Sequence, residues 1–371
     1  MSNAADSPPV RIEAADCRTP FGDARATCAA LRAGRRALAL QPVLGAAGGD
    51  AVPLAPLPGR ALDETAPPAW LPCLDGLVAT LPEAPWGDAR HPVFVTSSNF
   101  GVGSLYAFAH DHDPAHLEFC TPFALVEGLR RRFGWGGNVA VLSHACVSAH
   151  LGLLLASRAL RAGPAERALV FTFDFISPFV TGGFHALKIL NPELPAPYAV
   201  RPTGSIGLGD GAAFAVLGKA GAGFSLSAQT LHNEMHHFTA NRADGTGFAA
   251  SLEPVADAAR GRRLWLKGHG TGTLEAGRLE AEALARLFPG APLVSWKGGL
   301  GHTLGSCGLV ELAIALAAMR GGEAPGTVGS APPCFVDAVA TEPFATSAYD
   351  GVVLASNAFG GAHATCLLTH D

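Results

Sequence analysis

Charged residues are scarce in this chain, and neither sign of charge dominates it. Only 15% of its 371 residues are Asp, Glu, Lys or Arg, and 26 basic residues face 31 acidic ones, for a net charge of −5. Nucleic-acid-binding proteins usually carry a basic excess or stripe, so the composition gives no support to that class of partner. The hydrophobic content of 49% suits a globular protein with a large buried core.

The chain also lacks paired cysteines. It has eight cysteines, and none forms a C-x-x-C pair, so neither a zinc ribbon nor a thioredoxin-like redox motif is indicated. Scattered free cysteines are typical of small buried apolar residues in a reducing compartment.

Long apolar runs are missing as well. The longest by this reading, near Leu151 to Ala156, is ended by Arg158 and is far shorter than the ~20 residues that cross a bilayer. The segment Met1 to Val10 is polar and lacks the charged-then-apolar pattern of a signal peptide. We therefore expect a cytoplasmic protein without a membrane span.

Short apolar segments alternate with helical patterns, which predicts an α/β protein with buried strands. The stretch from Pro42 to Pro85 is rich in Pro, Ala and Gly and predicts irregular structure with at most short helices. A break near Gly218–Gly223 predicts two similar halves, residues 1–220 and 221–371. The predicted strands are 92–96, 139–142, 168–173, 212–217, 224–228, 264–267, 293–296, 352–355 and 365–368. The predicted helices are 24–33, 122–133, 147–162, 279–287 and 307–319.

Cys146 lies where a predicted strand turns into a predicted helix. Its segment reads Ser143-His144-Ala145-Cys146-Val147-Ser148, and Ala145 leaves room around the sulfur. A helix N-terminus stabilises a thiolate and lowers its pKa, so this position suits a nucleophile. A packed core cysteine is an equally good interpretation of the segment alone.

His269 and His302 each lie in a glycine-rich segment. His269 belongs to Lys267-Gly268-His269-Gly270-Thr271-Gly272-Thr273, and such a loop presents polar side chains into a cleft. His302 follows Lys297 in Lys297-Gly298-Gly299-Leu300-Gly301-His302. Lys297 at the end of a buried strand needs a partner, and Glu311 is the candidate. Taken singly, His302 is equally well explained as an ordinary turn residue, whereas the loop around His269 favours a functional role over an incidental turn.

A second set of polar residues, His232, Glu234, His236 and His237, has the composition of a metal site. Its spacing matches neither a regular helix nor a known ligand pattern, so hydrogen-bonded loop residues are the favoured interpretation and no metal is expected.

Taken together and in order, the segments resemble the motifs of the β-ketoacyl synthases (ketosynthases) of fatty-acid and polyketide assembly. Cys146 corresponds to the nucleophile of the family's Thr-Ala-Cys, with His144 in place of the Thr. His269 corresponds to the His of His-Gly-Thr-Gly-Thr, which is complete here. The other matches are Lys297 and His302 (Lys-Ser-Asn-Ile-Gly-His), Glu311 (the acidic residue after Gly-His-Thr-Leu-Gly) and Phe359-Gly360-Gly361 (the Phe-Gly-Gly loop, whose Phe gates acyl entry in relatives).

Besides His144, three positions depart from the family pattern. Gly277 stands where an Asp normally follows the first His motif, although Glu280 is kept. Gly299 replaces the Asn before the second His, and His363 replaces the Asn of Phe-Gly-Gly-Thr-Asn. The departures indicate a specialised synthase, similar to the small ketosynthases and chain-length-factor-like proteins of bacterial aryl polyene clusters.

The resemblance implies a thiolase fold, with five layers α/β/α/β/α built from two similar halves, and a homodimer or a heterodimer with a paralogue. It implies that Cys146 takes an acyl group from a carrier-protein thioester, with an oxyanion hole from the N–H groups of Cys146 and Phe359 and a gate at Phe359 and Gly360. His269 and His302 would stabilise the enolate left when a malonyl thioester loses carbon dioxide, braced by Lys297 and Glu311. Thr271 and Thr273 would contact the phosphopantetheine arm of an acyl carrier protein, without a metal or redox cofactor.

Two alternatives stay open. A chain-length-factor-like partner subunit would have lost catalysis, which the retained Cys146 disfavours and the Gly277 and Gly299 departures favour. An acyltransferase or thioesterase would need Cys146 and one histidine only. Arginines that could bind an acidic carrier protein are Arg130, Arg131 and Arg132, or Arg260, Arg262 and Arg263, and candidate acyl-tunnel residues are Phe173, Phe175, Phe179 and Phe184.

Overall fold

A ten-stranded sheet runs through the protein and is built from two runs of five strands with the same pairing pattern. The computed structural model describes residues 9–42, 50–136, 138–219, 223–237 and 239–370. In the first run the order is β1 (Val10–Arg18), β8 (Gly211–Gly218), β6 (Arg167–Asp174), β4 (Val93–Thr96) and β5 (Val139–Leu142). In the second it is β9 (Phe224–Asn233), β15 (Ala362–His370), β14 (Gly351–Ala358), β10 (Leu264–Lys267) and β11 (Leu293–Val294).

Each run has two antiparallel pairings followed by two parallel ones. The runs join where Val10 and Arg11 of β1 pair with Leu226 and Ser225 of β9. Smaller strands form two separate sheets: β2 (Ala39–Pro42), β3 (Ala51–Ala55) and β7 (Leu208–Gly209) in one, β12 (Glu323–Ala324) and β13 (Phe344–Ala345) in the other. The predicted division between residues 220 and 221 lies outside the described residues and stays a prediction.

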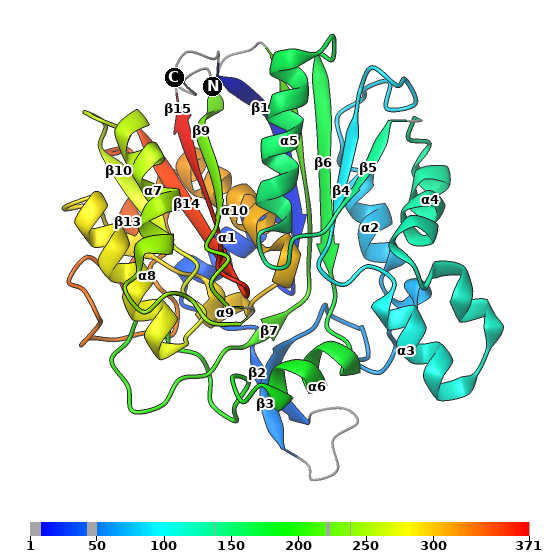
Figure 1. Ribbon diagram of the computed structural model, residues 1–371, viewed down its shortest axis with the longest axis horizontal. Helices are drawn as coiled ribbons and strands as arrows, with labels where there is room; N and C mark the ends of the chain where they lie inside the picture. The colour runs from blue at the N-terminus through cyan, green and yellow to red at the C-terminus, as the bar shows by residue number, and fades with distance from the viewer. Residues whose placement is uncertain (1–8, 43–49, 137, 220–222, 238, 371) are drawn as a thin grey trace.

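Helices form three layers around the two halves of the sheet (Figure 1). The central layer holds α1 (Ala24–Arg32), α5 (Ser148–Ala162) and α10 (Cys307–Gly321), which contacts strands of both halves. One outer layer has α2 (Leu71–Val78) and α4 (Pro122–Phe133), and the other has α7 (Thr246–Ala258) and α8 (Leu274–Leu287). The result is the α/β/α/β/α thiolase architecture. The remaining helices are α3 (Val102–Asp111), α6 (Pro178–Ala186), α9 (Lys297–Leu300) and the 3₁₀ turns Pro67–Ala69, Pro114–Phe119 and Leu304–Ser306.

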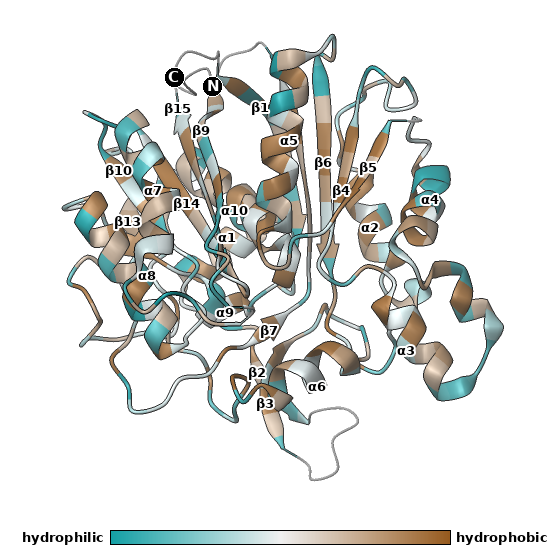
Figure 2. Ribbon diagram, in the orientation of Figure 1, coloured by the Kyte–Doolittle hydropathy of each residue, from teal (hydrophilic) through white to brown (hydrophobic). Residues whose placement is uncertain are grey.

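The hydrophobic core follows these layers. The central cluster joins α5 and α10 to the inner faces of both half-sheets, and two further clusters lie under the outer helices. Figure 2 shows the apolar colouring along β4 and β5 and hydrophilic segments on α4 and α8. Each half-sheet is thus covered on both faces, which is why its strands read as continuous apolar runs rather than alternating ones.

Helix α10 corrects the expectation about apolar runs. The segment Leu304–Gly321 has the length and composition of a membrane-spanning helix, and 78% of it is buried within the protein. A helix that is apolar all round can be the core helix of a large protein, and α10 fills that role here.

The strand predictions at 139–142 and 264–267 and the helix prediction at 122–133 match the observed bounds. Strand β1 and helices α2, α3, α6 and α7 were not predicted individually. Helix α7 contains Pro254, a residue that argues against a helix interior when only local sequence is considered.

A buried ion pair ties the start of β8 to the preceding irregular region. Both carboxylate oxygens of Asp210 accept from the Arg60 guanidinium, at 2.7 and 2.8 Å, and also from the backbone N–H groups of Leu57 and Ile176. The two side chains are 2% and 0% exposed. Breaking such a pair leaves an uncompensated charge in a dry interior.

We expect Asp210→Asn to lower the free energy of unfolding by about 3–5 kcal/mol, measured by urea denaturation. The matched control is Glu282→Gln, which removes an exposed partner of Arg278 and is expected to change stability by at most about 1 kcal/mol. Equal losses of unfolding free energy in the two variants would contradict a stabilising role for the buried Arg60–Asp210 pair.

Candidate active site

Cys146 lies in a tight turn between β5 and α5, two residues before the helix begins. Ala145 has a φ of 45°, in the left-handed region that side chains other than glycine rarely adopt. Ser148 holds the turn, because its hydroxyl donates to the carbonyl of Ala145 at 2.6 Å and accepts from the N–H of His144 at 2.7 Å. The sulfur-bearing residue is therefore fixed by its neighbours in sequence.

His269 is positioned by the carboxylate of Glu280 on α8. The backbone N–H groups of His269 and Gly270 donate to its two oxygens at 2.6 and 2.9 Å. The hydroxyl of Tyr198 donates to the same carboxylate at 2.9 Å. At Gly268 a Cβ would lie 2.1 Å from the Tyr198 hydroxyl, so this loop requires glycine to wrap closely around the buried tyrosine.

His302 is held by a backbone bond to the segment that precedes β8. Its N–H donates to the carbonyl of Gly207 at 2.6 Å. Gly301 has a φ of 76°, and a Cβ there would lie 2.6 Å from the backbone of Leu208. Only glycine permits this approach, which explains the Gly-His pair in the sequence.

The three segments meet at one cavity of about 300 Å³. The rings of His269 and His302 lie edge to face, with centroids 4.9 Å apart and planes at 88°. Neither nitrogen of His302, nor Nδ1 of His269, has a hydrogen-bond partner within the described part of the chain. Thr271, Thr273 and Phe359 also line the cavity, whereas Gly360 lies at the tip of the β14–β15 hairpin beside it.

The rest of the cavity wall is mostly apolar. It includes Phe184, Ile189, Ile206, Leu279 and Ala358. Phe184 packs against Phe359, with ring centroids 5.8 Å apart. Of the four phenylalanines considered for an acyl tunnel, Phe184 alone lines this cavity, and Phe179 is 61% exposed.

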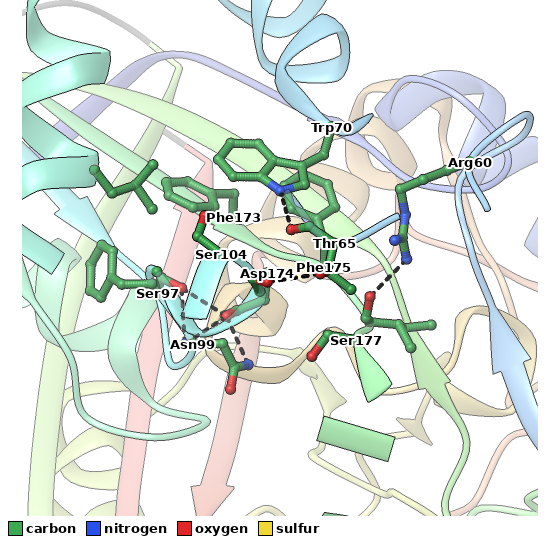
Figure 3. A pocket seen from close by; sticks show the side chains of 15 residues that line it. Arg60, Thr65, Trp70, Ser97, Asn99, Ser104, Phe173, Asp174, Phe175 and Ser177 are labelled. Atoms are coloured by element: carbon green, nitrogen blue, oxygen red, sulfur yellow. Dashed lines mark hydrogen bonds between the residues drawn. The ribbon is translucent and has the colours of Figure 1, made fainter. Parts of the chain in front are cut away.

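Phe173 and Phe175 instead stack on Trp70 beside a second, smaller cavity of about 30 Å³ (Figure 3). Asp174 lies at its edge and accepts hydrogen bonds from Ser97, Ser98 and Asn99. Burial raises the pKa of Asp174 to about 6. Since Ser98 also accepts from the N–H of Gly305, this cluster braces the loop after His302 rather than the substrate cavity.

Behind the histidines, Glu311 on α10 contacts two buried lysines. Oε1 accepts from Lys297 at 2.6 Å, as the sequence predicted, and Oε2 contacts Lys267 at the end of β10. Lys267 was missed as a partner, although a lysine that ends an apolar strand was a usable signal. Burial lowers the pKa of Lys267 to about 8. Burial also opposes the charge of Lys297, but the Glu311 carboxylate outweighs it and holds the pKa of Lys297 above its usual value.

Both catalytic candidates among the histidines are neutral near pH 7. Burial lowers the pKa of His269 and of His302 well below the usual value, and the nearby Lys297 charge acts in the same direction. A neutral imidazole has one N–H to donate and one nitrogen to accept, so each ring can donate to a carbonyl oxygen in the cavity.

The pKa of the Cys146 thiol shifts in the opposite direction from the one that the sequence predicts. Burial, followed by the neighbouring Cys307, raises its pKa, and the positive charge of Lys297 only partly offsets this. The expected lowering by the helix terminus is therefore outweighed, because desolvation penalises a thiolate in a dry pocket.

The structure shows what surrounds each residue that departs from the family pattern. At Gly299 a Cβ would lie 2.6 Å from the Leu31 side chain, so α1 occupies the space of the missing Asn. Gly277 lies near Tyr198 and Phe335. His144 bonds through Nε2 to Asn233 at 2.9 Å, and His363 is fully buried and bonded to Glu234.

Other candidate residues lie apart from the cavity. Arg130 and Arg131 share Glu127, Arg132 pairs with Asp75, and Arg260 pairs with Asp257. Arg260, Arg262 and Arg263 border a surface groove at the start of β10, at the opposite end of that strand from His269. Around Glu234, the described side chains do not gather three potential metal ligands.

Comparison with known proteins finds similarity to β-ketoacyl synthases. Residues 226–330 match the family model "Beta-ketoacyl synthase, C-terminal domain". The chain is 27% identical over 285 residues to a granaticin polyketide putative β-ketoacyl synthase 1 from Streptomyces violaceoruber, covering 69% of this chain and 68% of that protein.

Two solved structures share the fold. One is a ketosynthase (ApeO) in complex with its chain length factor (ApeC) from Xenorhabdus doucetiae, with a TM-score of 0.80 at 18% identity over 98% of both chains. The other is a type II polyketide acyl carrier protein in complex with its ketosynthase bound to the hexaketide, with a TM-score of 0.84 at 15% identity over 99% of this chain and 100% of that one.

Because the Cys146 thiol is desolvated, we expect slow alkylation by iodoacetamide at pH 7. The rate should rise about tenfold per pH unit up to pH 9 without a plateau, since only the thiolate reacts. Intact-mass spectrometry of the wild type and a Cys146→Ala variant isolates the Cys146 adduct. A plateau near pH 7 would show that the helix terminus prevails over burial.

A second prediction concerns Lys267. Its pKa is about 8 in the folded protein and about 10.5 when unfolded, so between these values the unfolded chain binds more protons and stability rises with pH. Lys267→Met should abolish that rise while leaving the Lys297–Glu311 pair intact. Urea denaturation at pH 7.5 and 9.5 tests this, and an unchanged pH dependence in the variant would contradict it.

Proposed function

From the match of residues 226–330 to the ketosynthase family model, we propose that the chain is a divergent ketosynthase, a β-ketoacyl synthase acting in polyketide assembly. The reaction is the decarboxylative Claisen condensation of a Cys146-bound acyl group with a malonyl carrier-protein thioester. The observation that carries the proposal is the pair of neutral histidines with unpartnered ring nitrogens beside Cys146 in one apolar cavity.

In the first half-reaction Cys146 attacks the thioester carbonyl of an acyl carrier protein. The acyl–sulfur bond to the carrier breaks, a new one forms to Cys146, and the thiol proton passes to the departing carrier thiolate. The backbone N–H groups of Cys146 and Phe359 serve as the oxyanion hole, and Phe359 and Gly360 form the gate. The raised pKa of Cys146 makes proton loss part of this step rather than a preceding equilibrium.

In the second half-reaction His269 and His302 donate to the thioester carbonyl oxygen of malonyl carrier protein. The bond to the malonyl carboxylate breaks, carbon dioxide leaves, and its electron pair enters an enolate that the two N–H groups stabilise. The enolate carbon attacks the acyl carbon, the bond from that carbon to Cys146 breaks, and the departing thiolate takes up a proton from solvent. Burial keeps both rings neutral, and the charge of Lys297, held by Glu311 behind the rings, acts in the same direction.

The cavity suits a thioester arm. Thr271 and Thr273 line it and lie 3.2 Å apart through their hydroxyl oxygens, where they can contact the phosphopantetheine of a carrier protein. The proposal requires no metal or redox cofactor. The protein acts in the cytoplasm as a dimer, either with a second copy of itself or with a paralogue. Aryl polyene and fatty-acid assembly are the candidate pathways beside polyketide assembly in general.

A chain-length-factor-like partner subunit is the second candidate. Its support is the solved ketosynthase and chain length factor pair with the same fold, together with the Gly277 and Gly299 departures. Against it, Cys146 and both histidines face one cavity.

Intact-mass spectrometry after incubation with acyl carrier protein and then malonyl carrier protein tests the proposal. We expect an acyl adduct that Cys146→Ala lacks and that malonyl carrier protein discharges with release of carbon dioxide. His302→Ala should retain the adduct but lose about 10²–10⁴-fold in carbon dioxide release, because one enolate donor is gone.

Absence of an adduct on the protein alone, and its appearance only on a co-purified paralogue, would support the partner-subunit function. An adduct hydrolysed without carbon dioxide release would instead indicate acyl transfer or thioester hydrolysis.

A further inference from the structure

A continuous line of buried and partly buried hydrogen bonds runs from the loop after β9 to His269. Glu234 Oε1 lies 2.6 Å from His363 Nε2, and His363 Nδ1 lies 2.8 Å from Asn357 Oδ1. Asn357 Nδ2 donates to Glu280 Oε1 at 2.8 Å, the same oxygen that accepts from the His269 N–H. Asn357 also lines the Cys146 cavity. The line therefore connects the β14–β15 hairpin, which carries Phe359, to the backbone of His269.

The direction of each bond follows from its neighbours. Glu280 accepts two backbone N–H groups and the Tyr198 hydroxyl, so its oxygens are acceptors and the amide of Asn357 must donate to it. The oxygen of Asn357 then faces His363, and Nδ1 of His363 must donate. At Nε2, a hydrogen bond to Glu234 requires one more proton, carried either by the imidazole or by the carboxyl group.

The pair has no room to rearrange. The side chains of Glu234 and His363 are both 0% exposed, and Phe248 of α7 packs on the His363 ring with centroids 4.5 Å apart. A Cβ at Gly247 or Gly361 would collide with Glu234. The second Glu234 oxygen accepts from the backbone N–H of Arg242 at 2.7 Å. The other charged or titratable groups nearby are His232 on β9, the exposed Arg242–Asp244 pair and Glu280 behind Asn357.

We propose that Glu234 and His363 are positioning residues that share one proton and, through Asn357, hold the Phe359 hairpin and His269 in their catalytic arrangement. The inference rests on the proposed function for its catalytic consequence only. His363 thus replaces the Asn of the family's Phe-Gly-Gly-Thr-Asn motif with a group that bonds at both ends. Loss of the shared proton sets a carboxylate against an imidazole lone pair, so the line breaks as pH rises.

Glu234→Gln tests this sharply. The glutamine can accept from the Arg242 N–H and donate its amide to Nε2 of a neutral His363, which still donates from Nδ1 to Asn357. The line is then complete without a shared proton. His363→Phe keeps a ring against Phe248 but removes both bonds. Glu253→Gln, an exposed glutamate on α7, is the matched control.

Burial lowers the pKa of His363, and the Glu234 carboxylate opposes that shift. The first measurement is therefore ¹⁵N NMR of the histidine side chains from pH 5 to 10, with the His363 signals assigned by their absence in His363→Phe. We expect the His363 nitrogens to titrate in the wild type and in Glu253→Gln, and to stay in the neutral Nδ1–H form in Glu234→Gln. Identical His363 titration in wild type and Glu234→Gln would overturn the proposal. This arm does not depend on any enzyme activity.

The second measurement is the rate of carbon dioxide release from malonyl carrier protein over the same pH range. The wild type should lose rate as pH rises through the value at which His363 titrates, and Glu234→Gln should lack that loss. Lys267 is unchanged in both proteins and cancels in the comparison. At pH 7, His363→Phe should lower kcat at least tenfold with a smaller change in KM.

Matching pH–rate profiles of the wild type and Glu234→Gln, or an unchanged kcat in His363→Phe, would overturn the positioning role. A folded wild type without carbon dioxide release at any pH would contradict the proposed function instead, and the NMR comparison would still decide whether the proton is shared. Should His363→Phe fail to fold, Glu234→Gln alone decides both measurements.

Discussion

One buried carboxylate, that of Glu311, fixes the relative positions of the two histidine loops. It projects from the central helix α10, and its two oxygens contact the end of β10 through Lys267 and the start of α9 through Lys297. His269 and His302 follow these lysines closely in sequence. Because moving either ammonium group away would leave an unpaired charge in a dry interior, the two loops cannot drift apart. Burial keeps both imidazole rings neutral, and the same positive charges act in that direction.

The parts of the site that depend on residue type and spacing along the chain were predictable. The sequence indicated Cys146 at a strand-to-helix turn, the two glycine-bound histidines and the Lys297–Glu311 pair, and the structure brings these residues together. Lys267 and the line through Asn357 and His363 were not predictable, because their partners come from different strands and helices. The pKa of Cys146 was expected in the wrong direction, since desolvation depends on packing that a local sequence does not specify.

In the fold, too, elements with local sequence signals were predictable, and those that depend on long-range packing were not. Strands β5 and β10 and helix α4 have strong local signals, namely short apolar runs in the strands and a Thr-Pro start with a terminal Gly134 in the helix. Helix α7 forms in spite of Pro254, because its apolar face packs on β9 and β15. The pairing of β1 with both β8 and β9 is a long-range property that no window of the sequence contains.

The close approach of α1 to Gly299 bears on how this chain could have diverged. Any side chain at position 299 would meet Leu31, and the backbone carbonyl of Arg35 lies 3.1 Å from the same point. An Asn at this position, as in the ketosynthase motif that the segment resembles, would therefore require α1 to move or Leu31 to become smaller. A side chain at position 299 therefore requires an earlier change in α1 or at Leu31, whereas a smaller residue at position 31 creates no clash with the glycine.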